Sequence, residues 1–121
     1  MSKKVLVVED TEDNRQILRD LLGMSGYEMV EAHDGAEGVA KAAEHKPDLI
    51  LMDIQMPVMD GYEATRRIKA DQALKAIPVI AVTSYALSGD EDKARAAGCD
   101  GYIAKPYSPR QMLAKVREVI G

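Results

Sequence analysis

Residues 48–53 read DLILMD, a run of four apolar residues that ends in an aspartate, and this stretch decides the fold. An apolar run without polar alternation is typical of a strand buried on both faces, as in a parallel sheet covered by helices. The same pattern recurs in KKVLVVED at 3–10, in IPVIAVT at 77–83 and in GYIAK at 101–105. The chain is therefore predicted to hold several parallel strands, each ending at a polar residue.

Helical segments alternate with these runs. Apolar residues recur at helical spacing after the first run, and Glu28–Ala32 is predicted to be a weaker, alternating strand. Four expected helix starts carry an Asp or Ser three residues before a Glu or Gln, as in a capping box; they begin at Asp34, Asp60, Ser88 and Ser108. Five strand–helix units predict an α/β fold of the doubly wound type.

Size and composition limit the classes of protein. The 121 residues indicate one domain, 1–121, and 46% apolar with 30% charged residues is usual for a soluble globular protein. The net charge of −4 argues against binding to nucleic acid, because proteins that bind phosphate backbones normally present a basic face. No apolar run approaches the ~20 residues that span a membrane, and a single cysteine, Cys99, favours a reducing, cytoplasmic location.

The polar residues at the ends of the runs form the candidate site. They are two neighbouring acids, Glu9 and Asp10, together with Asp53, Thr83 and Lys105. Parallel strands end at one edge of their sheet, where such proteins bind ligands, so we expect these side chains to converge. Crowded carboxylates repel one another unless a hard cation lies among them, and Mg²⁺ prefers such oxygen ligands. The lysine adds a fixed positive charge, and the set suits phosphoryl chemistry on an aspartate.

The motifs VLVVED, DLILMDIQMPVMDG, PVIAVTS and YIAKP, in this order and spacing, closely resemble the receiver domain of two-component response regulators. The resemblance covers the whole chain and is closest to stand-alone receivers and to receivers fused to hybrid histidine kinases. It implies a flavodoxin-like (βα)5 fold, with a five-stranded parallel sheet in the order 2-1-3-4-5 and five helices on both faces. It also implies a phosphorylation-activated switch that is not an enzyme, since it catalyses only its own phosphorylation and slow dephosphorylation.

Position by position, the resemblance assigns a metal site. Asp53 matches the aspartate that accepts the phosphoryl group from phosphohistidine, and it also contributes to a site for Mg²⁺, with Mn²⁺ as a substitute ion. Asp10 matches the direct metal ligand, and Glu9 matches the neighbour that helps to hold the ion through water. The backbone carbonyl of Gln55 is expected to be a further ligand. Taken singly, each acid is an ordinary strand end, and only their joint placement favours the functional interpretation.

The resemblance also assigns the residues around the phosphoryl group. Lys105 is expected to pair with Asp53 before the reaction and with the phosphoryl oxygens after it, and its bond to Pro106 is expected to be cis. The hydroxyl of Thr83 is expected to bind the phosphoryl group. Tyr102 is then expected to swing inward and fill the space that Thr83 leaves, although a static, half-buried tyrosine is the alternative.

Further residues are expected at the edge of the site: Met56, Pro106, Ser84 and Tyr85. Tyr85 is bulky and cannot orient a hydrolytic water as a carboxamide would. This predicts a phosphoryl group that lasts for minutes or longer without a phosphatase. The alternative is that Tyr85 packs on its loop or contributes to a partner surface.

Two surfaces are expected to bind partners. The resemblance places a sensor histidine kinase or a histidine phosphotransfer protein on the first helix, at Asn14, Arg15, Ile17, Leu18 and Leu21. Leu18 or Leu21 is expected to belong to the core instead. A downstream protein target is placed on the surface of the fourth helix, fifth strand and fifth helix, including Tyr107 and residues 88–97. The chain is expected to be a monomer or a weak, phosphorylation-dependent dimer that binds neither nucleic acid nor membrane.

Other interpretations stay open. The start of the chain favours a complete stand-alone regulator, and a receiver module excised from a hybrid histidine kinase is the alternative. A Mg²⁺-dependent phosphohydrolase with an aspartyl-phosphate intermediate is more distant, because such enzymes carry a second aspartate two residues after the nucleophile, where this chain has Gln55. A flavin-binding module of similar fold is disfavoured, since the acids between Glu9 and Asp13 would repel its phosphate.

Overall fold

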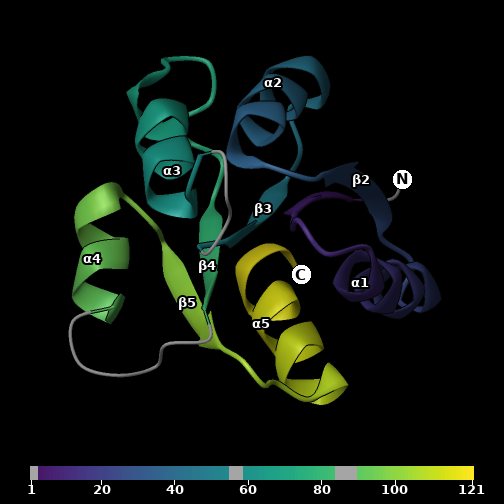
Figure 1. Ribbon diagram of the computed structural model, residues 1–121. Coiled ribbons are helices and arrows are strands. Elements are labelled where there is room, and N and C mark those ends of the chain that lie inside the picture. The colour runs from purple at the N-terminus through teal and green to yellow at the C-terminus, as the bar shows by residue number, and fades with distance from the viewer. Residues whose placement is uncertain (1–2, 55–58, 84–89) are drawn as a thin grey trace.

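Five strands alternate with five helices in residues 3–54, 59–83 and 90–121, which are the residues described by a computed structural model (Figure 1). In chain order, the elements are β1 (Lys4–Val8), α1 (Glu12–Met24), β2 (Glu28–Ala32), α2 (Gly35–His45), β3 (Leu49–Asp53), α3 (Gly61–Ala70), β4 (Val79–Thr83), α4 (Asp90–Ala97), β5 (Gly101–Ala104) and α5 (Pro109–Ile120). The predicted alternation of strand and helix is confirmed.

The strands form one parallel sheet in the order β2-β1-β3-β4-β5, which confirms the predicted doubly wound, flavodoxin-like fold. The chain first moves outward from β1 to β2 and then crosses to β3, so the strand order reverses between β1 and β3. Sheets of this kind bind ligands at the carboxyl ends of the strands beside such a reversal. Val8 pairs with Met52 across this point, and the next residues are therefore Glu9 and Asp53.

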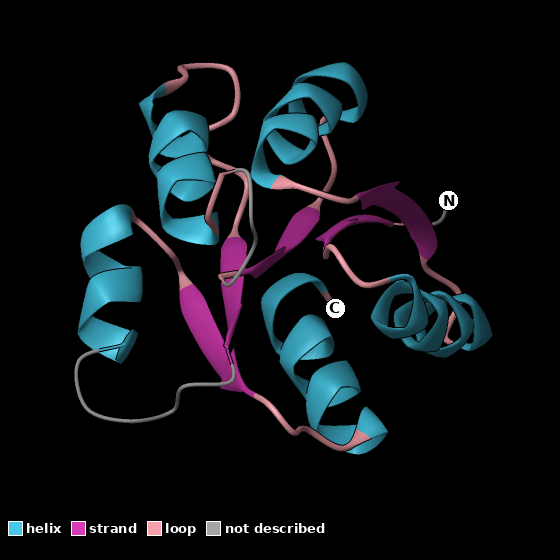
Figure 2. Cartoon of the chain, viewed as in Figure 1, coloured by secondary structure: helices cyan, strands magenta, loops and turns pink. Residues whose placement is uncertain are grey.

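Two apolar layers cover the two faces of the sheet, which lies between the helices in Figure 2. The layer beneath α2, α3 and α4 includes Leu6, Ile50, Met52, Ala64 and Ile68. The layer beneath α1 and α5 includes Leu18, Leu22, Leu51, Met112 and Val116. Every residue of β3 and β4 is buried, which confirms that the unbroken apolar runs are strands covered on both faces.

In β3 and β4, the polar residue that follows the apolar run still belongs to the strand. Asp53 pairs with Val82, and Thr83 pairs with Ala104. Their exposed fractions are only 4% and 1%. The sheet therefore places a carboxylate and a hydroxyl at its edge and still keeps both largely out of solvent.

The start of α5 forms the predicted capping box. Ser108 Oγ accepts a hydrogen bond from the Gln111 backbone N–H at 3.1 Å, and Gln111 Oε1 accepts one from the Ser108 N–H at 2.7 Å. Pro109 occupies the first helical position, where its missing N–H leaves no hydrogen bond unmade. The helix start that was predicted at Ser88 lies outside the described residues.

At α2 and α3, only half of the predicted capping box forms. Asp34 accepts from the backbone N–H of Glu37 at 2.7 Å, and Asp60 accepts from that of Glu63 at 2.9 Å. The Glu37 side chain binds the N–H of His33 instead of its own N-cap residue, and Glu63 binds arginines of α3. The cap thus depends on the short Asp, whereas the longer Glu has competing partners nearby.

The helices of the described residues are short. The longest, α1, has 13 residues. Among these helices, none combines the length and the apolar character that a membrane crossing would need.

Candidate functional site

Three acids lie together at the carboxyl edge of the sheet. Each of Glu9, Asp10 and Asp53 offers a carboxylate oxygen, and these oxygens lie within 4.8 Å of one another. Glu9 and Asp53 are each 4% exposed, whereas Asp10 is exposed. The pairing of β1 with β3 sets Glu9 beside Asp53, and the turn toward α1 then carries Asp10 to the solvent side of the cluster.

Lys105 reaches this cluster from the end of β5. Its Nζ lies 3.3 Å from Glu9 Oε2 and 3.7 Å from Asp53 Oδ2. Its backbone N–H donates to the Thr83 carbonyl at 2.7 Å, and its peptide bond to Pro106 is cis, as expected. One ammonium group therefore stands beside three acids, and negative charge remains in excess.

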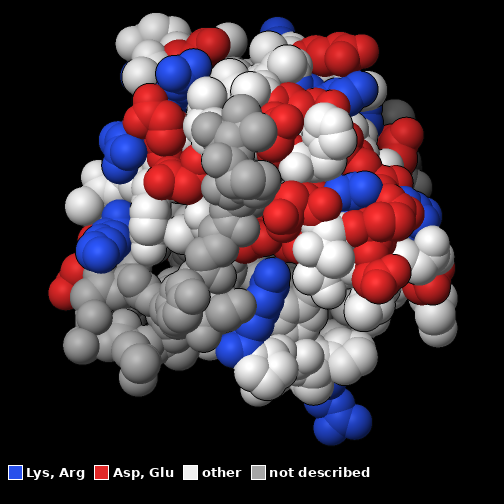
Figure 3. All heavy atoms as spheres, viewed as in Figure 1, with Lys and Arg blue, Asp and Glu red and all other residues white. Residues whose placement is uncertain are grey.

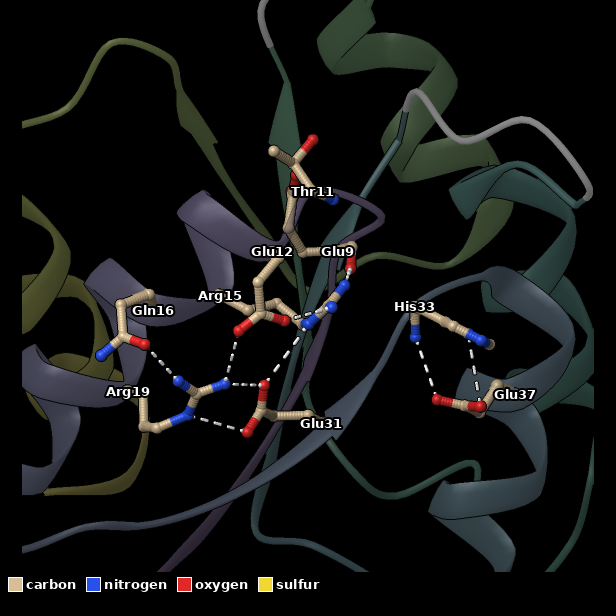
Figure 4. A network of polar contacts seen from close by, with 9 residues as sticks. All are labelled: Glu9, Thr11, Glu12, Arg15, Gln16, Arg19, Glu31, His33 and Glu37. Carbon is tan, nitrogen blue, oxygen red and sulfur yellow. Dashed lines mark hydrogen bonds and ion pairs between the residues drawn. The ribbon is translucent and has the colours of Figure 1, made fainter.

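Glu9 is fixed at all of its polar groups. Oε1 accepts from the Thr11 N–H at 3.3 Å and from Asn14 Nδ2 at 3.0 Å, while Oε2 faces the lysine. Its backbone N–H donates to the Ala32 carbonyl at 3.0 Å, and its own carbonyl accepts from Arg15 Nη1 at 2.6 Å (Figure 4). Apart from Lys105, these partners belong to β2 and to the start of α1, so the corner where β1 meets α1 is fixed from two sides.

The electrostatics of the cluster suit a divalent cation. Burial raises the pKa of Glu9, but hydrogen bonds with Asp53 and Asn14 and the charge of Lys105 lower it, and the net pKa lies below 4.5. Three acids crowded beside one ammonium group favour a bound cation, because it reduces the repulsion between their carboxylates. Acidic side chains also gather over α1 and α2 on the face shown in Figure 3. Mg²⁺ takes carboxylate oxygens and water as ligands, so this donor set fits the ion.

Thr83 and Tyr102 lie on neighbouring strands and on the same face of the sheet. Tyr102 pairs with Ala81, two residues before Thr83, and side chains two residues apart point to the same face. Tyr102 is half-buried and packs against the layer beneath α2, α3 and α4. This proximity is what a movement of one side chain in response to the other would require.

A pocket of about 480 Å³ adjoins the acids and is lined by Asn14, Ile17, Lys105, Pro106 and Tyr107. Ile17 is 54% exposed, whereas Leu18 is only 4% exposed, which confirms that one of the two candidate leucines belongs to the core. Tyr107, which was expected on the surface of the fourth helix, fifth strand and fifth helix, lines this pocket beside α1 and packs against the layer beneath α1 and α5. Its part in that partner surface stays a prediction.

Four predicted residues of the site lie outside the described residues: Gln55, Met56, Ser84 and Tyr85. The expected metal contact of the Gln55 carbonyl and the expected effect of Tyr85 on hydrolysis stay predictions.

Gly61 has a part in the site that the sequence did not reveal. A Cβ atom at Gly61 would lie 2.4 Å from the carbonyl oxygen of Asp53 and 2.8 Å from the Cα of Ile54. The start of α3 therefore packs directly on the backbone behind Asp53, and only glycine fits there. An Asp-Gly pair at a helix start is the only sequence signal, and it does not say what the glycine touches.

Arg15 was expected on the binding surface of the first helix, but its side chain is only 13% exposed. The guanidinium turns toward the carbonyl of Glu9 and toward two acids, Glu12 and Glu31. Nothing in the local sequence distinguishes this arginine from a solvated one.

Comparison with known proteins agrees with this geometry. The sequence model of the response regulator receiver domain matches residues 5–117. The polar-differentiation response regulator DivK of Brucella ovis is 46% identical over 121 residues, which cover 100% of this chain and 98% of that protein.

Two solved structures are also similar to this chain over almost its whole length. The chemotaxis protein CheY4 of Vibrio cholerae has a TM-score of 0.94 and 32% identity, over 99% of this chain and 100% of that one. The receiver domain of the sensor histidine kinase PA1611 of Pseudomonas aeruginosa has a TM-score of 0.92 and 36% identity, over 100% of this chain and 99% of that one. That second structure has a magnesium ion coordinated in its active-site cleft.

Proposed function

Because the chain belongs to the family of response regulator receiver domains of two-component signalling, we propose that it is a switch that accepts a phosphoryl group on Asp53 from a phosphohistidine donor. One observation carries the proposal. The Asp53 carboxylate lies in a cluster with Glu9 and Asp10, within 4.8 Å, and Lys105 Nζ stands 3.7 Å from it. Residues 1–121 act as one receiver domain in this proposal, and the domain works in the cytoplasm.

The acid cluster would hold Mg²⁺, or Mn²⁺ in its place. Asp10 and Asp53 would bind the ion directly, Glu9 would hold it through water, and the backbone carbonyl of Gln55 would complete the protein ligands. When bound, the ion offsets negative charge, so that a carboxylate can accept a phosphoryl group. The magnesium ion in the related PA1611 receiver supports this assignment.

The transfer exchanges one bond to phosphorus for another. A carboxylate oxygen of Asp53 attacks the phosphorus in line, and the new O–P bond forms as the N–P bond of phosphohistidine breaks. The electron pair of the broken bond returns to the histidine nitrogen. Lys105 stabilises the charge on the phosphoryl oxygens, and the Thr83 hydroxyl donates a hydrogen bond to one of them.

Two surfaces would connect this chemistry to other proteins. The pocket between α1 and the turn after β5, with exposed Ile17 at its edge, suits a sensor histidine kinase or a histidine phosphotransfer protein beside Asp53. On the other side, an inward movement of Tyr102 would change the surface of α4, β5 and α5 for a downstream protein target. Phosphorylation would act by stabilising one of two packed states.

Acetyl phosphate is a simple donor for the decisive experiment. Wild-type protein with Mg²⁺ and acetyl phosphate should gain one phosphoryl group, located at Asp53 by peptide mass spectrometry. Asp53→Asn protein and wild-type protein with EDTA should gain none. Modification of a different residue would overturn the proposal. Steady release of phosphate from small phosphomonoesters would favour a phosphohydrolase instead.

A further inference from the structure

Arg15 connects three elements at the corner between β1 and α1 (Figure 4). Nη1 donates to the carbonyl of Glu9 at 2.6 Å, Nη2 donates to Glu12 Oε2 at 2.6 Å, and Nε lies 3.4 Å from Glu31 Oε1. These partners belong to the end of β1, the first turn of α1 and β2. A planar guanidinium with donors in a fixed fork suits such a contact, and the single ammonium of a lysine does not.

The contact with the Glu9 carbonyl bears directly on the acid cluster. Glu9 and Asp10 are consecutive, and the peptide between them carries the carbonyl that Arg15 binds. The orientation of this peptide sets where both carboxylates lie relative to Asp53. In the described part of the chain, Arg15 is the residue that donates to this carbonyl. Loss of the Arg15 guanidinium would therefore free the peptide to turn.

The acid Glu31 is fixed in turn by a second arginine. Arg19 Nε donates to Glu31 Oε2 at 2.9 Å, and Arg19 Nη2 donates to Glu31 Oε1 at 2.5 Å. Arg19 Nη2 also lies 3.3 Å from Glu12 Oε1. The two arginines and two glutamates of this network have no net charge, so the network as a whole supplies geometry and not an electrostatic attraction.

We propose that Arg15 is a positioning residue for the divalent-cation site. By binding the carbonyl of Glu9, it keeps the carboxylates of Glu9 and Asp10 at the spacing from Asp53 that a cation requires. The inference rests on the proposed function, because the cation site belongs to it. Residues that orient metal ligands from outside the coordination shell commonly contribute strongly to metal affinity.

Charge and geometry predict opposite results for Arg15. A positive charge near the site repels a cation, so removal of the charge alone would strengthen cation binding. Removal of the guanidinium contact would weaken cation binding, because the Glu9 peptide would no longer be fixed. Arg15→Lys keeps the charge and loses the three-way contact, whereas Arg15→Gln loses both.

The test measures Mn²⁺ binding to unphosphorylated protein without any phosphoryl donor, by the electron paramagnetic resonance signal of the free ion. Arg15→Lys should bind Mn²⁺ about tenfold more weakly than wild type, the lower end of effects known for such outer partners. Arg15→Gln should also bind more weakly, despite its lost positive charge. Arg66→Gln is the matched control, because Arg66 pairs with Glu63 on α3, and it should bind as wild type does.

Thermal unfolding of the cation-free variants is measured in parallel. A merely structural role would lower the unfolding temperature of Arg15→Lys and leave the Mn²⁺ affinity of the folded protein unchanged, which would overturn the inference. Tighter binding by Arg15→Gln, with wild-type binding by Arg15→Lys, would assign Arg15 a charge effect only and overturn it as well. If the proposed function itself is wrong, the result is different: wild type would then bind Mn²⁺ no more tightly than Asp10→Asn does.

Discussion

The β1–α1 corner and the β5 edge border the same acids, but different interactions stabilise them. The β1–α1 corner comprises Glu9–Arg15 and Glu31, and the β5 edge comprises Gly101–Lys105 and α4. At the corner, hydrogen bonds and ion pairs fix every polar group of Glu9, and Arg15 joins three elements. β1 also has a paired strand on each side.

The β5 edge depends more on packing. Among the described strands β5 pairs only with β4, and each of its four residues is half-buried. A pocket of about 240 Å³ lies beside Tyr102 and is also lined by Cys99 and Lys115. Tyr102 at this edge therefore borders open space, and many of the described polar contacts around the acids lie at the corner.

This difference indicates where a receiver of this kind can change its shape. Directional contacts at the corner suit a cation site, which needs constant ligand positions. A half-buried side chain next to open space suits a rearrangement, because it can adopt a second packing there. We therefore expect phosphorylation to change the β5 edge and to leave the corner as it is.

Lys105 joins the two regions, and its replacement should have the largest effect. Lys105→Met removes the ammonium 3.3 Å from Glu9 and 3.7 Å from Asp53. Loss of one such electrostatic contact commonly costs about 100-fold in rate, so the rate of phosphorylation by acetyl phosphate should fall by about that factor. Lys105→Arg, which keeps a positive charge, should retain more activity. An unchanged rate in Lys105→Met would show that the two regions act independently.

Lys69 is the main polar contact that ties α3 to the turn before β5. Its Nζ donates to Asp100 Oδ2 at 2.7 Å and to the Ile77 carbonyl at 2.7 Å, and its side chain is 18% exposed. Hydrogen bonds to charged groups contribute about 1.5–3 kcal/mol, so Lys69→Met should lower the free energy of unfolding by about 2 kcal/mol. Denaturant unfolding measures this, with the exposed Lys75→Met as control.

Amide hydrogen exchange in the same variant tests whether the two regions unfold independently. In Lys69→Met, exchange should rise at Val79, whose N–H donates to Asp100, and along β5. Exchange at the β1–α1 corner should not change, because Lys69 takes no part in the contacts described there. A rise at both places would mean that the two regions unfold together.

Tyr102 is the side chain at the β5 edge that is expected to respond to phosphorylation. Tyr102→Ala removes a half-buried ring, which should cost about 1 kcal/mol of stability. Phosphorylation itself should continue, because Tyr102 is not one of the clustered acids and packs against the layer beneath α2, α3 and α4. The exchange changes that phosphorylation produces in β5 and α4, and the binding of a downstream partner, should weaken.

Tyr27→Ala is the matched control, since Tyr27 is half-buried in the opposite layer. It should lose similar stability and keep the response to phosphorylation. If both tyrosine variants respond as wild type does, Tyr102 is a static packing residue.

The sequence predicted the elements whose signals are local. Strands β3 and β4 follow from unbroken apolar runs, and the capping box of α5 follows from Ser108 and Gln111. The meeting of Glu9, Asp10 and Asp53 was also predictable, because parallel strands end at the same edge of a sheet whatever their distance in sequence.

Contacts that depend on a choice among partners could not be predicted. Glu37 has the spacing to bind the backbone N–H of its N-cap residue Asp34. Its side chain accepts a hydrogen bond from the His33 N–H instead. Arg15 reads as a surface residue of a helix, and its contact with the Glu9 carbonyl exists only because β1, β2 and α1 meet there. The closeness of Gly61 to the backbone of Asp53 likewise arises from the position of α3 against β3.

Tyr107 lies close to charged groups of both regions, so its pKa should depend on them. The expected change in this pKa is the smallest of the effects predicted. It lines a narrow space with Glu9, Asp53 and Lys105. Burial raises the pKa of the Tyr107 phenol above its ordinary value of 10.0, and the charges of Glu9 and Asp53 raise it further. Asp53→Asn removes one of these charges and should lower the pKa of Tyr107. The change should be small, because burial is the largest cause and remains.

The ultraviolet absorbance of phenolate measures this pKa, with a Tyr107→Phe counterpart of each protein subtracted to remove the other tyrosines. A raised folded pKa means that Tyr107 stabilises the fold fully below pH about 10 and loses this contribution as pH rises through the folded pKa. Asp53→Asn should therefore lose less stability above pH about 10 than wild type does, because its folded pKa lies closer to the unfolded one. Asp20→Asn, an exposed position on α1, should leave the titration unchanged. An unchanged pKa of Tyr107 in Asp53→Asn would mean that the charge of the acids does not affect this tyrosine beyond the end of β5. The two regions would then be connected through Lys105 alone.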